Sequence, residues 1–560
     1  MKLTAIILLI LFLSADLVMP VQAFTINKDA SVSSAFSTNA LANKNKKQSS
    51  SLLTESKVTE TKQINAQTLN YEQLIIHNNK QYLWFNNTTN NNKLNLSGLS
   101  LLSLLNDLGI NSLLSSDLVN LASQSNKQIK AIDQQLTQQL YTIATLFNGY
   151  QFKPLEKPKE DIFNAVKNQQ LATYLDQLLP QFDQVVRLRT AIAYYQKLAK
   201  KTWPIIDDKL SLVLGQGHKE VIKLRSMLFA LTDLKKRQRS RYRQHIFDPE
   251  IVTALKKFQT RHGLKADGKL NTKTIQALNI SPARRIEIMQ INLWRWLSLP
   301  SIPPTRYVMV NIPAYRLYFI ENQQQTLTMR VIVGDNQHRT PIMVTQVSSL
   351  TVNPQWTPTY NIIHKELLVE NARNPGSLKR QNFKLAKGYG AKQVLRPVFK
   401  DSTAIKNALR QYKLVQAAGS NNALGKYRFN IKNFHSVYLH DTPAKNLFSK
   451  QYRALSHGCV RLQSANLLAK KFMKNEAKNK QKQVKNALVV NKTQHIKLAK
   501  NIAVYLTYQT VWLTASGQIQ WLEDIYQQDT AAKLNTVQAQ LSSDINFNLS
   551  SDLYSNTNSP

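Results

Sequence analysis

The stretch Ser456-His457-Gly458-Cys459-Val460-Arg461 decides how this chain is interpreted, because it holds the single cysteine among 560 residues. One cysteine cannot form an internal disulfide, which excludes a small disulfide-stapled scaffold. A thiol is a nucleophile only when it is ionised, so it needs a base or a positive charge nearby. His440, at the end of an apolar run, and Arg461 are candidates for these two roles.

Segments rich in β-branched and aromatic residues surround this stretch and predict strands. The expected strands cover residues 307–312, 316–320, 328–333, 343–352, 427–431, 436–440, 487–490, 503–513 and 517–522. A short helix is expected from about Ser464. Residues 359–415 interrupt the strands with a polar, helix-like pattern. We therefore expect a mainly-β catalytic domain over residues 305–527, with a helical insertion that caps its active site and selects the acceptor.

A three-helix unit is expected at residues 210–280. Its second helix has the clearest signals, since Asp248 suits the N-cap, Pro249 suits the first helical position and Gly263 suits the end. The segment from Ile251 to Leu278, with Phe-Gln, His-Gly-Leu and Asp-Gly before its last helix, resembles the type 1 peptidoglycan-binding domain. This resemblance implies association with the cell wall, although a small bundle of this kind also serves as scaffold.

The cysteine segment belongs to a wider resemblance. Tyr438-Leu-His440-Asp-Thr-Pro443, its spacing to 456–461, and Leu424-Gly-Lys-Tyr-Arg-Phe-Asn430 look like the L,D-transpeptidase catalytic domain of YkuD type. Asn353-Pro-Gln-Trp356 resembles the Asn-Pro-x-Trp segment of the same family. Tyr508-Gln-Thr-Val-Trp512, with Asp524-Ile-Tyr526, resembles the C-terminal strands of its large Gram-negative periplasmic members. The two resemblances together cover about residues 210–527. They imply a multidomain α+β chain that acts on peptidoglycan stem peptides and glycan.

The resemblance also implies a mechanism without a cofactor or metal. Cys459 would attack the bond between diaminopimelate and D-alanine of a stem peptide and form a thioester, with His440 as the base. The orienting and oxyanion groups would be Asp441, through its carbonyl or its carboxylate, Tyr438, and the backbone at Gly458. Substrate binding would involve Arg461, His457, Ser456 and Trp356. Acylation of Cys459 by carbapenems is a further implication.

The N-terminus predicts export. Lys2, an apolar run from Ala5 to Leu13 and Val21-Gln22-Ala23 form the pattern of a signal peptide, residues 1–23. The expected location is the periplasm, with no transmembrane helix after cleavage; an uncleaved inner-membrane anchor is the alternative. A low-complexity lead-in is expected at 24–98, a helical region at 99–209 and a disordered tail at 528–560. The charge of +40 is dispersed and carries no nucleic-acid motif, so no nucleic-acid partner is expected.

Other interpretations remain open at this stage. His435, His440, His457 and Cys459 could bind zinc, but their spacing fits no usual pattern. A non-catalytic wall-binding scaffold would use only the helical units. Within the enzyme class, water as acceptor would give a carboxypeptidase and a lipoprotein lysine would give an anchoring reaction.

Overall fold

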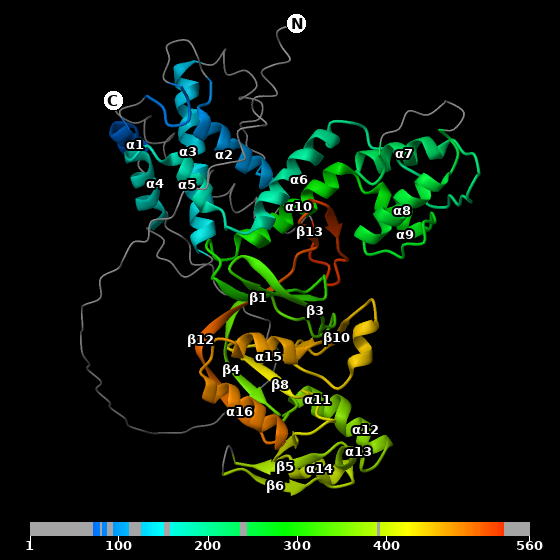
Figure 1. Ribbon diagram of the computed structural model, residues 1–560. Coiled ribbons are helices and arrows are strands. Elements are labelled where there is room, and N and C mark those ends of the chain that lie inside the picture. The colour runs from blue at the N-terminus through cyan, green and yellow to red at the C-terminus, as the bar shows by residue number, and fades with distance from the viewer. Residues whose placement is uncertain are drawn as a thin grey trace, which may run out of the picture. The chain divides into compact units, whose positions relative to one another are not determined.

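The computed structural model describes residues 71–78, 81–86, 93–110, 125–149, 157–235, 244–388 and 392–530. The expected signal peptide and most of the expected tail therefore lie outside the described residues. Helices come first along the chain and strands dominate the later part (Figure 1). This arrangement confirms the predicted multidomain α+β class.

The early helices share one hydrophobic core. They are α1 (Tyr71–Asn78), α2 (Leu96–Asp107), α3 (Asn126–Gly149), α4 (Lys157–Lys167), α5 (Leu171–Leu178) and α6 (Asp183–Ala199). The buried carboxylate of Asp133 accepts hydrogen bonds from the Tyr71 hydroxyl at 2.6 Å and from the backbone N–H groups of Leu83 and Trp84 at 2.9 and 2.8 Å. Residues 71–78 and 81–86 are thus packed, and the prediction of a low-complexity lead-in up to residue 98 is wrong for them. The N–H groups of Leu83 and Trp84 bind Asp133, which lies 50 and 49 residues further along the chain, so the local sequence did not show this packing.

The next helices are α7 (Glu220–Ala230), α8 (Pro249–Arg261), α9 (Thr272–Asn279) and α10 (Pro282–Leu297). Asp248 caps α8 as predicted, because its Oδ1 accepts from the N–H groups of Glu250 and Ile251, both at 3.1 Å. Gly268 has φ +75°, and a Cβ there would lie 2.7 Å from Val252, so the turn before α9 requires glycine. Trp294 and Trp296 lie in the last turn of α10.

Within the described ranges, a nine-stranded sheet has the order β10-β3-β11-β9-β8-β4-β12-β1-β2, and a further pairing of β2 with β3 closes it on itself. Its strands are β1 (Arg306–Asn311), β2 (Arg316–Glu321), β3 (Gln324–Gly334), β4 (Met343–Val352), β8 (Tyr427–Ile431), β9 (Leu439–His440), β10 (Ala454–Ser456), β11 (Val460–Leu462) and β12 (Gln494–Thr507). A separate hairpin pairs β13 (Val511–Leu513) with β14 (Ile519–Trp521). Alternating burial along β8 shows why these residues form a strand with one face in the core.

Two helices follow Cys459 along the chain, α15 (Ala465–Met473) and α16 (Lys478–Val489). Phe472 of α15 packs against Phe319 and Phe429 of the sheet, with ring centroids 5.8 and 5.2 Å away. The predicted strand at 487–490 is wrong, since these residues end α16. No helix among the described residues is long and apolar enough to span a membrane.

The insertion folds around a small core of its own. It contains α11 (Tyr360–Ile362), a π-helical turn η3 (Ile363–Leu367), α12 (Leu368–Arg373), α13 (Ser377–Arg380) and α14 (Ser402–Ala408). It also contains a three-stranded sheet in the order β6-β5-β7, from β5 (Phe383–Lys387), β6 (Val394–Pro397) and β7 (Lys413–Gln416), which the sequence did not predict. The insertion is therefore mixed helix and strand. Its core includes Phe383, Ile405 and Leu414.

Candidate active site

Cys459 lies between β10 and β11, the two short strands that pair with the end of β3. Gly458 has φ +102°, which favours glycine at this turn. The Ser456 hydroxyl donates to the Cys459 carbonyl at 2.6 Å and accepts from the Gly458 N–H at 3.2 Å. The Thr340 hydroxyl donates to the Gly458 carbonyl at 2.8 Å. The loop that carries the thiol is thus fixed by its own hydrogen bonds.

His440 reaches the same place from the neighbouring strand. Strands β9 and β11 are parallel, with Leu439 opposite Val460 and His440 opposite Arg461, which brings Tyr438 beside Cys459. His440 is buried, and its Nδ1 lies 2.5 Å from the Asp441 carbonyl oxygen. The Asp441 carboxylate instead binds Lys445 Nζ at 2.6 Å. The carbonyl therefore accepts the Nδ1 proton and leaves Nε2 with a lone pair for catalysis.

Burial sets the protonation states of both groups. It lowers the pKa of His440 to about 3, with the charge of Arg461 acting in the same direction. Burial also raises the pKa of the Cys459 thiol, although hydrogen bonds from Tyr438 and the charges of Arg461 and Arg428 oppose this rise. The resting site is therefore a neutral thiol beside a neutral imidazole. The structure shows no hydrogen bond between the two side chains, both in the described part of the chain, as is common before substrate binds.

Tyr438 connects this site to the insertion. Its hydroxyl lies near the side chains of Cys459 and Trp356, and burial raises its pKa. The guanidinium of Arg428 lies 5.5 Å from the centroid of the Tyr438 ring. Trp356 also pairs through its backbone with Gln416 of β7 and lies 6.0 Å from the ring of Phe383. Trp356 thus packs against the insertion core and lies next to Tyr438, which lies next to the thiol of Cys459.

A second connection runs through His457. Its Nε2 lies 2.6 Å from a carboxylate oxygen of Glu366 in η3, and its ring centroid lies 4.7 Å from that of His338. Arg461 is half-buried, and the charges of Cys459 and Glu366 raise its pKa against the lowering by burial. It forms no ion pair with a carboxylate of the described residues. Because its charge is not matched by a bonded partner, Arg461 is available for an anionic group.

The structure brings together most of the residues that the sequence singled out. Cys459, His440, Tyr438, Arg461 and His457 converge through β9, β11 and their loops. Trp356 joins them from the insertion, while His435 is exposed on the preceding loop.

Two predicted roles need correction. Ser456 is 2% exposed, and its hydroxyl donates to the Cys459 carbonyl within the loop, so this hydroxyl is not available to a substrate. The N–H of Gly458 is bound to that hydroxyl and is not free for an oxyanion. The N–H of Cys459 forms no hydrogen bond to any described residue and is a better candidate.

Sequence reasoning missed Arg428, His338 and Glu366. Arg428 lies within a quoted motif, and its place on the alternating strand β8 was a usable signal. Nothing local marks Glu366, which lies 91 residues before its partner His457. Among the described residues no group of three or more His, Cys, Asp or Glu side chains could hold a metal ion.

Comparisons with known proteins follow the same division of the chain. The family described as "L,D-transpeptidase catalytic domain" matches residues 305–476, and that described as "Putative peptidoglycan binding domain" matches residues 218–278. A relative from Haemophilus influenzae, named "Putative L,D-transpeptidase", is 34% identical over 274 residues. This match covers 48% of the chain and 55% of the relative, so the chain spans about half the length of the curated relative that it matches.

Solved structures give only distant likenesses. An L,D-transpeptidase from Mycobacterium smegmatis is 12% identical with a TM-score of 0.19, over 37% of this chain and 60% of that one. One from Xylanimonas cellulosilytica is 12% identical with a TM-score of 0.15, over 54% and 99%. At such TM-scores these likenesses add nothing to the fold described above. Residues 305–476 are thus similar to the L,D-transpeptidase catalytic domain, and residues 218–278, ahead of them, are similar to the peptidoglycan-binding domain.

Proposed function

We propose that the chain is a peptidoglycan L,D-transpeptidase, which forms cross-links between diaminopimelate residues of adjacent stem peptides. The observation that carries this proposal is the position of His440. It lies on β9, which pairs with β11, the strand directly after Cys459, and its Nδ1–H donates to the Asp441 carbonyl. This arrangement gives a nucleophile and a base with a defined tautomer. The family match over residues 305–476 supports the same reaction.

The first half of the reaction forms a thioester. Nε2 of His440 takes the proton of Sγ as Sγ bonds to the carbonyl carbon between diaminopimelate and the terminal D-alanine. The oxyanion that forms there is stabilised by the N–H of Cys459 and the hydroxyl of Tyr438, which replace water with fixed dipoles. As the carbon–nitrogen bond breaks, the imidazolium returns its proton to the leaving D-alanine amine.

The second half transfers the acyl group. His440 accepts a proton from the acceptor amine as its nitrogen bonds to the thioester carbon, and the carbon–sulfur bond breaks. The proton then passes from the imidazolium to the departing thiolate, which restores the neutral pair. The low pKa keeps the imidazole of His440 neutral, with a lone pair on Nε2, at any pH well above 3.

Arg461 is proposed to bind a carboxylate of the donor stem. Its guanidinium lies close enough to Cys459 for their charges to interact, and no carboxylate of the described residues pairs with it. A guanidinium binds a carboxylate through two parallel hydrogen bonds, and lysine cannot reproduce that geometry. Arg461→Lys should therefore raise KM for a tetrapeptide stem about tenfold or more, and an unchanged KM would remove Arg461 from this role.

The insertion is proposed to select the acceptor through Glu366. This carboxylate belongs to the insertion, is 49% exposed, and reaches the Cys459 loop through His457. An acceptor amine is an ammonium ion before its proton is removed. A carboxylate attracts this cation but does not attract a neutral water molecule in the same way, so it favours the amine over water as acceptor. Glu366→Gln should lower the ratio of cross-linked to hydrolysed product about tenfold while donor-stem cleavage continues. An equal loss of both products would show that Glu366 only holds the loop together.

The main experiment compares the wild type with Cys459→Ala on purified sacculi, with muropeptides analysed by mass spectrometry. Direct cross-links between diaminopimelate residues should appear with the wild type alone, while the variant keeps its circular dichroism spectrum. Free tripeptide without cross-links would favour a carboxypeptidase, and binding to sacculi without any change in muropeptides would favour a scaffold. Incubation with a carbapenem should add one drug mass at Cys459.

We also propose a periplasmic location, supported by the N-terminal signal-peptide pattern. Cell fractionation with a fused periplasmic reporter checks this. Retention in the membrane fraction would favour an uncleaved anchor.

A further inference from the structure

The insertion holds an unusual share of the positive charge. Residues 371–416 contain eleven Lys and Arg and one acidic residue, Asp401, so 46 residues carry a quarter of the net charge of +40. The basic residues are Arg373, Lys379, Arg380, Lys384, Lys387, Lys392, Arg396, Lys400, Lys406, Arg410 and Lys413. All but the half-buried Lys384 are exposed. The net charge per residue in this segment is about three times that of the whole chain, so lysines dispersed for solubility do not explain it.

Internal ion pairs do not neutralise this charge. Apart from Lys413, whose side chain or backbone has another partner, none of these residues forms an ion pair with a carboxylate of the described chain. Of the three nearest carboxylates in sequence, Asp401 caps α14 through the Ala404 N–H and Glu366 lies against His457. The third, Glu370, is exposed directly before this segment and forms no ion pair with a described residue. The insertion therefore presents positive charge to whatever lies outside it.

Apolar side chains are exposed among these cations. Val394, Leu395 and Phe399 are 57%, 41% and 51% exposed. They lie on or just after β6, the edge strand of the order β6-β5-β7, together with the exposed Lys392, Arg396 and Lys400. We call residues 392–400 the basic-apolar strip. Val398 is 4% exposed and joins the insertion core, which fixes the strip on the body of the insertion.

A similar combination occurs at the C-terminal end of α16. Val489 and Val490 are 84% and 66% exposed, and Lys492 follows them. Asn353 Nδ2 donates to the carbonyls of Ala487 and Lys492 at 2.8 and 3.4 Å, three residues before the Trp356 bridge to β7. The end of α16 is thus attached at the base of the insertion.

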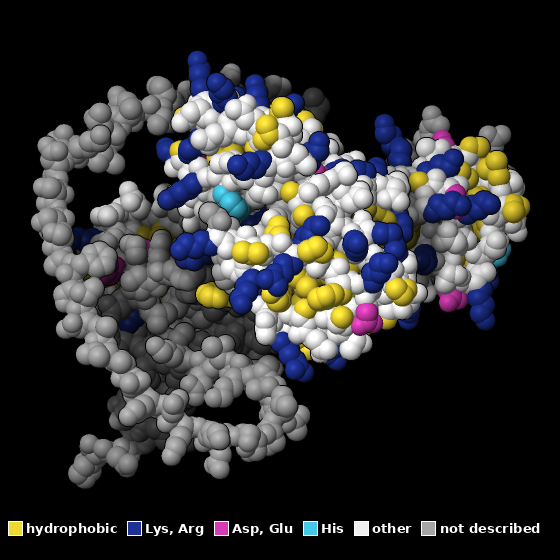
Figure 2. Space-filling model, turned by 90° about the horizontal axis from the view of Figure 1, so that it is seen from below, with side chains coloured by type: hydrophobic (Ala, Val, Ile, Leu, Met, Phe, Trp, Pro, Cys, Tyr) yellow, Lys and Arg dark blue, Asp and Glu magenta, His cyan; other side chains and the backbone are white. Residues whose placement is uncertain are grey.

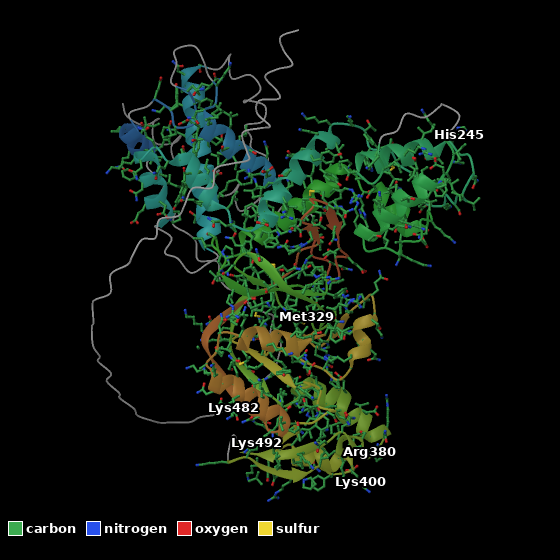
Figure 3. The ribbon with its side chains drawn as sticks, viewed as in Figure 1. His245, Met329, Arg380, Lys400, Lys482 and Lys492 are labelled. Atoms are coloured by element: carbon green, nitrogen blue, oxygen red, sulfur yellow. The ribbon has the colours of Figure 1, made fainter. Side chains whose placement is uncertain are left out.

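The pictures show this end of the molecule directly. In Figure 3, Arg380 and Lys400 project from the insertion, and Lys482 and Lys492 project from α16 and the segment after it, in the same lower part of the view. Seen from below in Figure 2, dark blue basic side chains alternate with yellow apolar ones and magenta is sparse. The surface is both cationic and apolar.

We propose that the basic-apolar strip binds the surface of an anionic phospholipid bilayer and holds the catalytic domain against it. Lys392, Arg396 and Lys400 would contact lipid phosphates, and Leu395 and Phe399 would enter the boundary between headgroups and acyl chains. A soluble anionic polymer would use the cations but leave the apolar side chains in water. A lipid surface uses both, and this is the reason for preferring it.

The test is co-sedimentation of the chain from Phe24 onward with vesicles. Mixed phosphatidylglycerol and phosphatidylcholine vesicles should bind it, and pure phosphatidylcholine vesicles should bind it weakly. Neutralising Lys392, Arg396 and Lys400 together to Gln should weaken binding about 100-fold, because each basic side chain at an anionic surface contributes about fivefold. Leu395→Ser with Phe399→Ser should weaken binding about tenfold at unchanged charge.

A matched control separates this site from the general charge of the chain. Lys197, Lys200 and Lys201, exposed at and after the end of α6, changed together to Gln, remove the same charge elsewhere. An equal loss of binding in this control would overturn the proposal in favour of diffuse attraction. An unaffected Leu395/Phe399 variant, or binding to soluble polyanions with none to vesicles, would also overturn it. Cys459→Ala should bind vesicles normally, so this outcome is independent of the proposed enzymatic function.

Discussion

The surroundings of Cys459 and the outer surface of the insertion both contain arginines, but these arginines are half-buried in the first region and exposed to water in the second. At the thiol, Arg428 and Arg461 are half-buried, and burial lowers the pKa of each. On the insertion, Arg373, Arg380 and Arg396 stand in water, where salt screens their charge beyond about 10 Å. A charge of the first kind acts on one atom nearby, while charges of the second kind act together on an extended surface.

This difference explains why the two regions need different backbones. The site requires fixed distances, so it uses strands held in register and a loop fixed by Ser456 and Thr340. The insertion surface requires only that cations and apolar groups are exposed close together, and a short edge strand such as β6 is sufficient. Trp356 and Glu366 connect the two regions, and substitutions there show whether they work as one unit.

The largest effect is expected at His440. His440→Gln should reduce the rate of D-alanine release about 10²–10⁴-fold, because the general base is lost. The same change should alter stability against pH. In the folded chain the pKa of His440 is about 3, below its usual value of 6.5. Between pH 6.5 and 3 this imidazole therefore binds a proton in the unfolded chain but not in the folded one.

The contribution of His440 to stability is therefore fully present above about pH 6.5 and is lost as the pH falls toward 3, at up to about 1.4 kcal/mol per pH unit. Urea denaturation of the wild type and His440→Gln at several pH values measures this slope. A slope that is the same in both would contradict the buried, neutral state of the imidazole.

The second prediction concerns the core of the insertion. Ile405 is fully buried with Phe383 and Leu414, and Ile405→Ala should cost about 3 kcal/mol. Hydrogen exchange should then accelerate in β5, β6 and β7 while β4 keeps its protection. Leu350→Ala in β4 is the matched control, which should accelerate exchange throughout the main sheet. Equal acceleration everywhere in both variants would mean that the insertion and the sheet unfold as one unit.

Much of the main sheet could be predicted from the sequence. The predicted strands at Met343–Val352 and Tyr427–Ile431 match β4 and β8 residue for residue, because each has enough β-branched and aromatic residues to define a strand. The pairing of Cys459 with His440 could also be expected, since both lie in short motifs 19 residues apart.

The remaining parts depend on distant contacts. The strands β5, β6 and β7 have four or five residues each, with one or two lysines or arginines among them, so local preference was too weak to reveal them. The core around Ile405 decides their pairing. The run Ala487-Leu-Val-Val490 suits a strand equally well, but the spacing of buried Val484 and Ala487 by three residues places it in a helix. Glu366 could not be found without knowing that η3 folds back to His457.

A smaller effect is expected where Trp356 meets Tyr438. Trp356→Phe keeps an aromatic ring in the insertion core but removes the N–H that reaches the Tyr438 hydroxyl. We expect kcat/KM to fall about fivefold, as for loss of one hydrogen bond of about 1 kcal/mol. Tyr438→Phe should cost more, and the double variant should cost no more than Tyr438→Phe alone. Additive losses in this cycle would show that the insertion acts on the site by another route.

The smallest effect concerns the reactivity of the thiol without substrate. Burial raises the pKa of Cys459, so a smaller fraction is thiolate at pH 7 than in a free cysteine, and iodoacetamide should modify it severalfold more slowly. The rate should rise with pH beyond the range in which a free thiol levels off. Arg461→Gln removes a charge that lowers this pKa, so it should slow the reaction further. If Arg461→Gln leaves alkylation unchanged but weakens stem binding, then this arginine serves the substrate carboxylate alone, and the thiolate depends on Tyr438, Arg428 and the base that removes its proton.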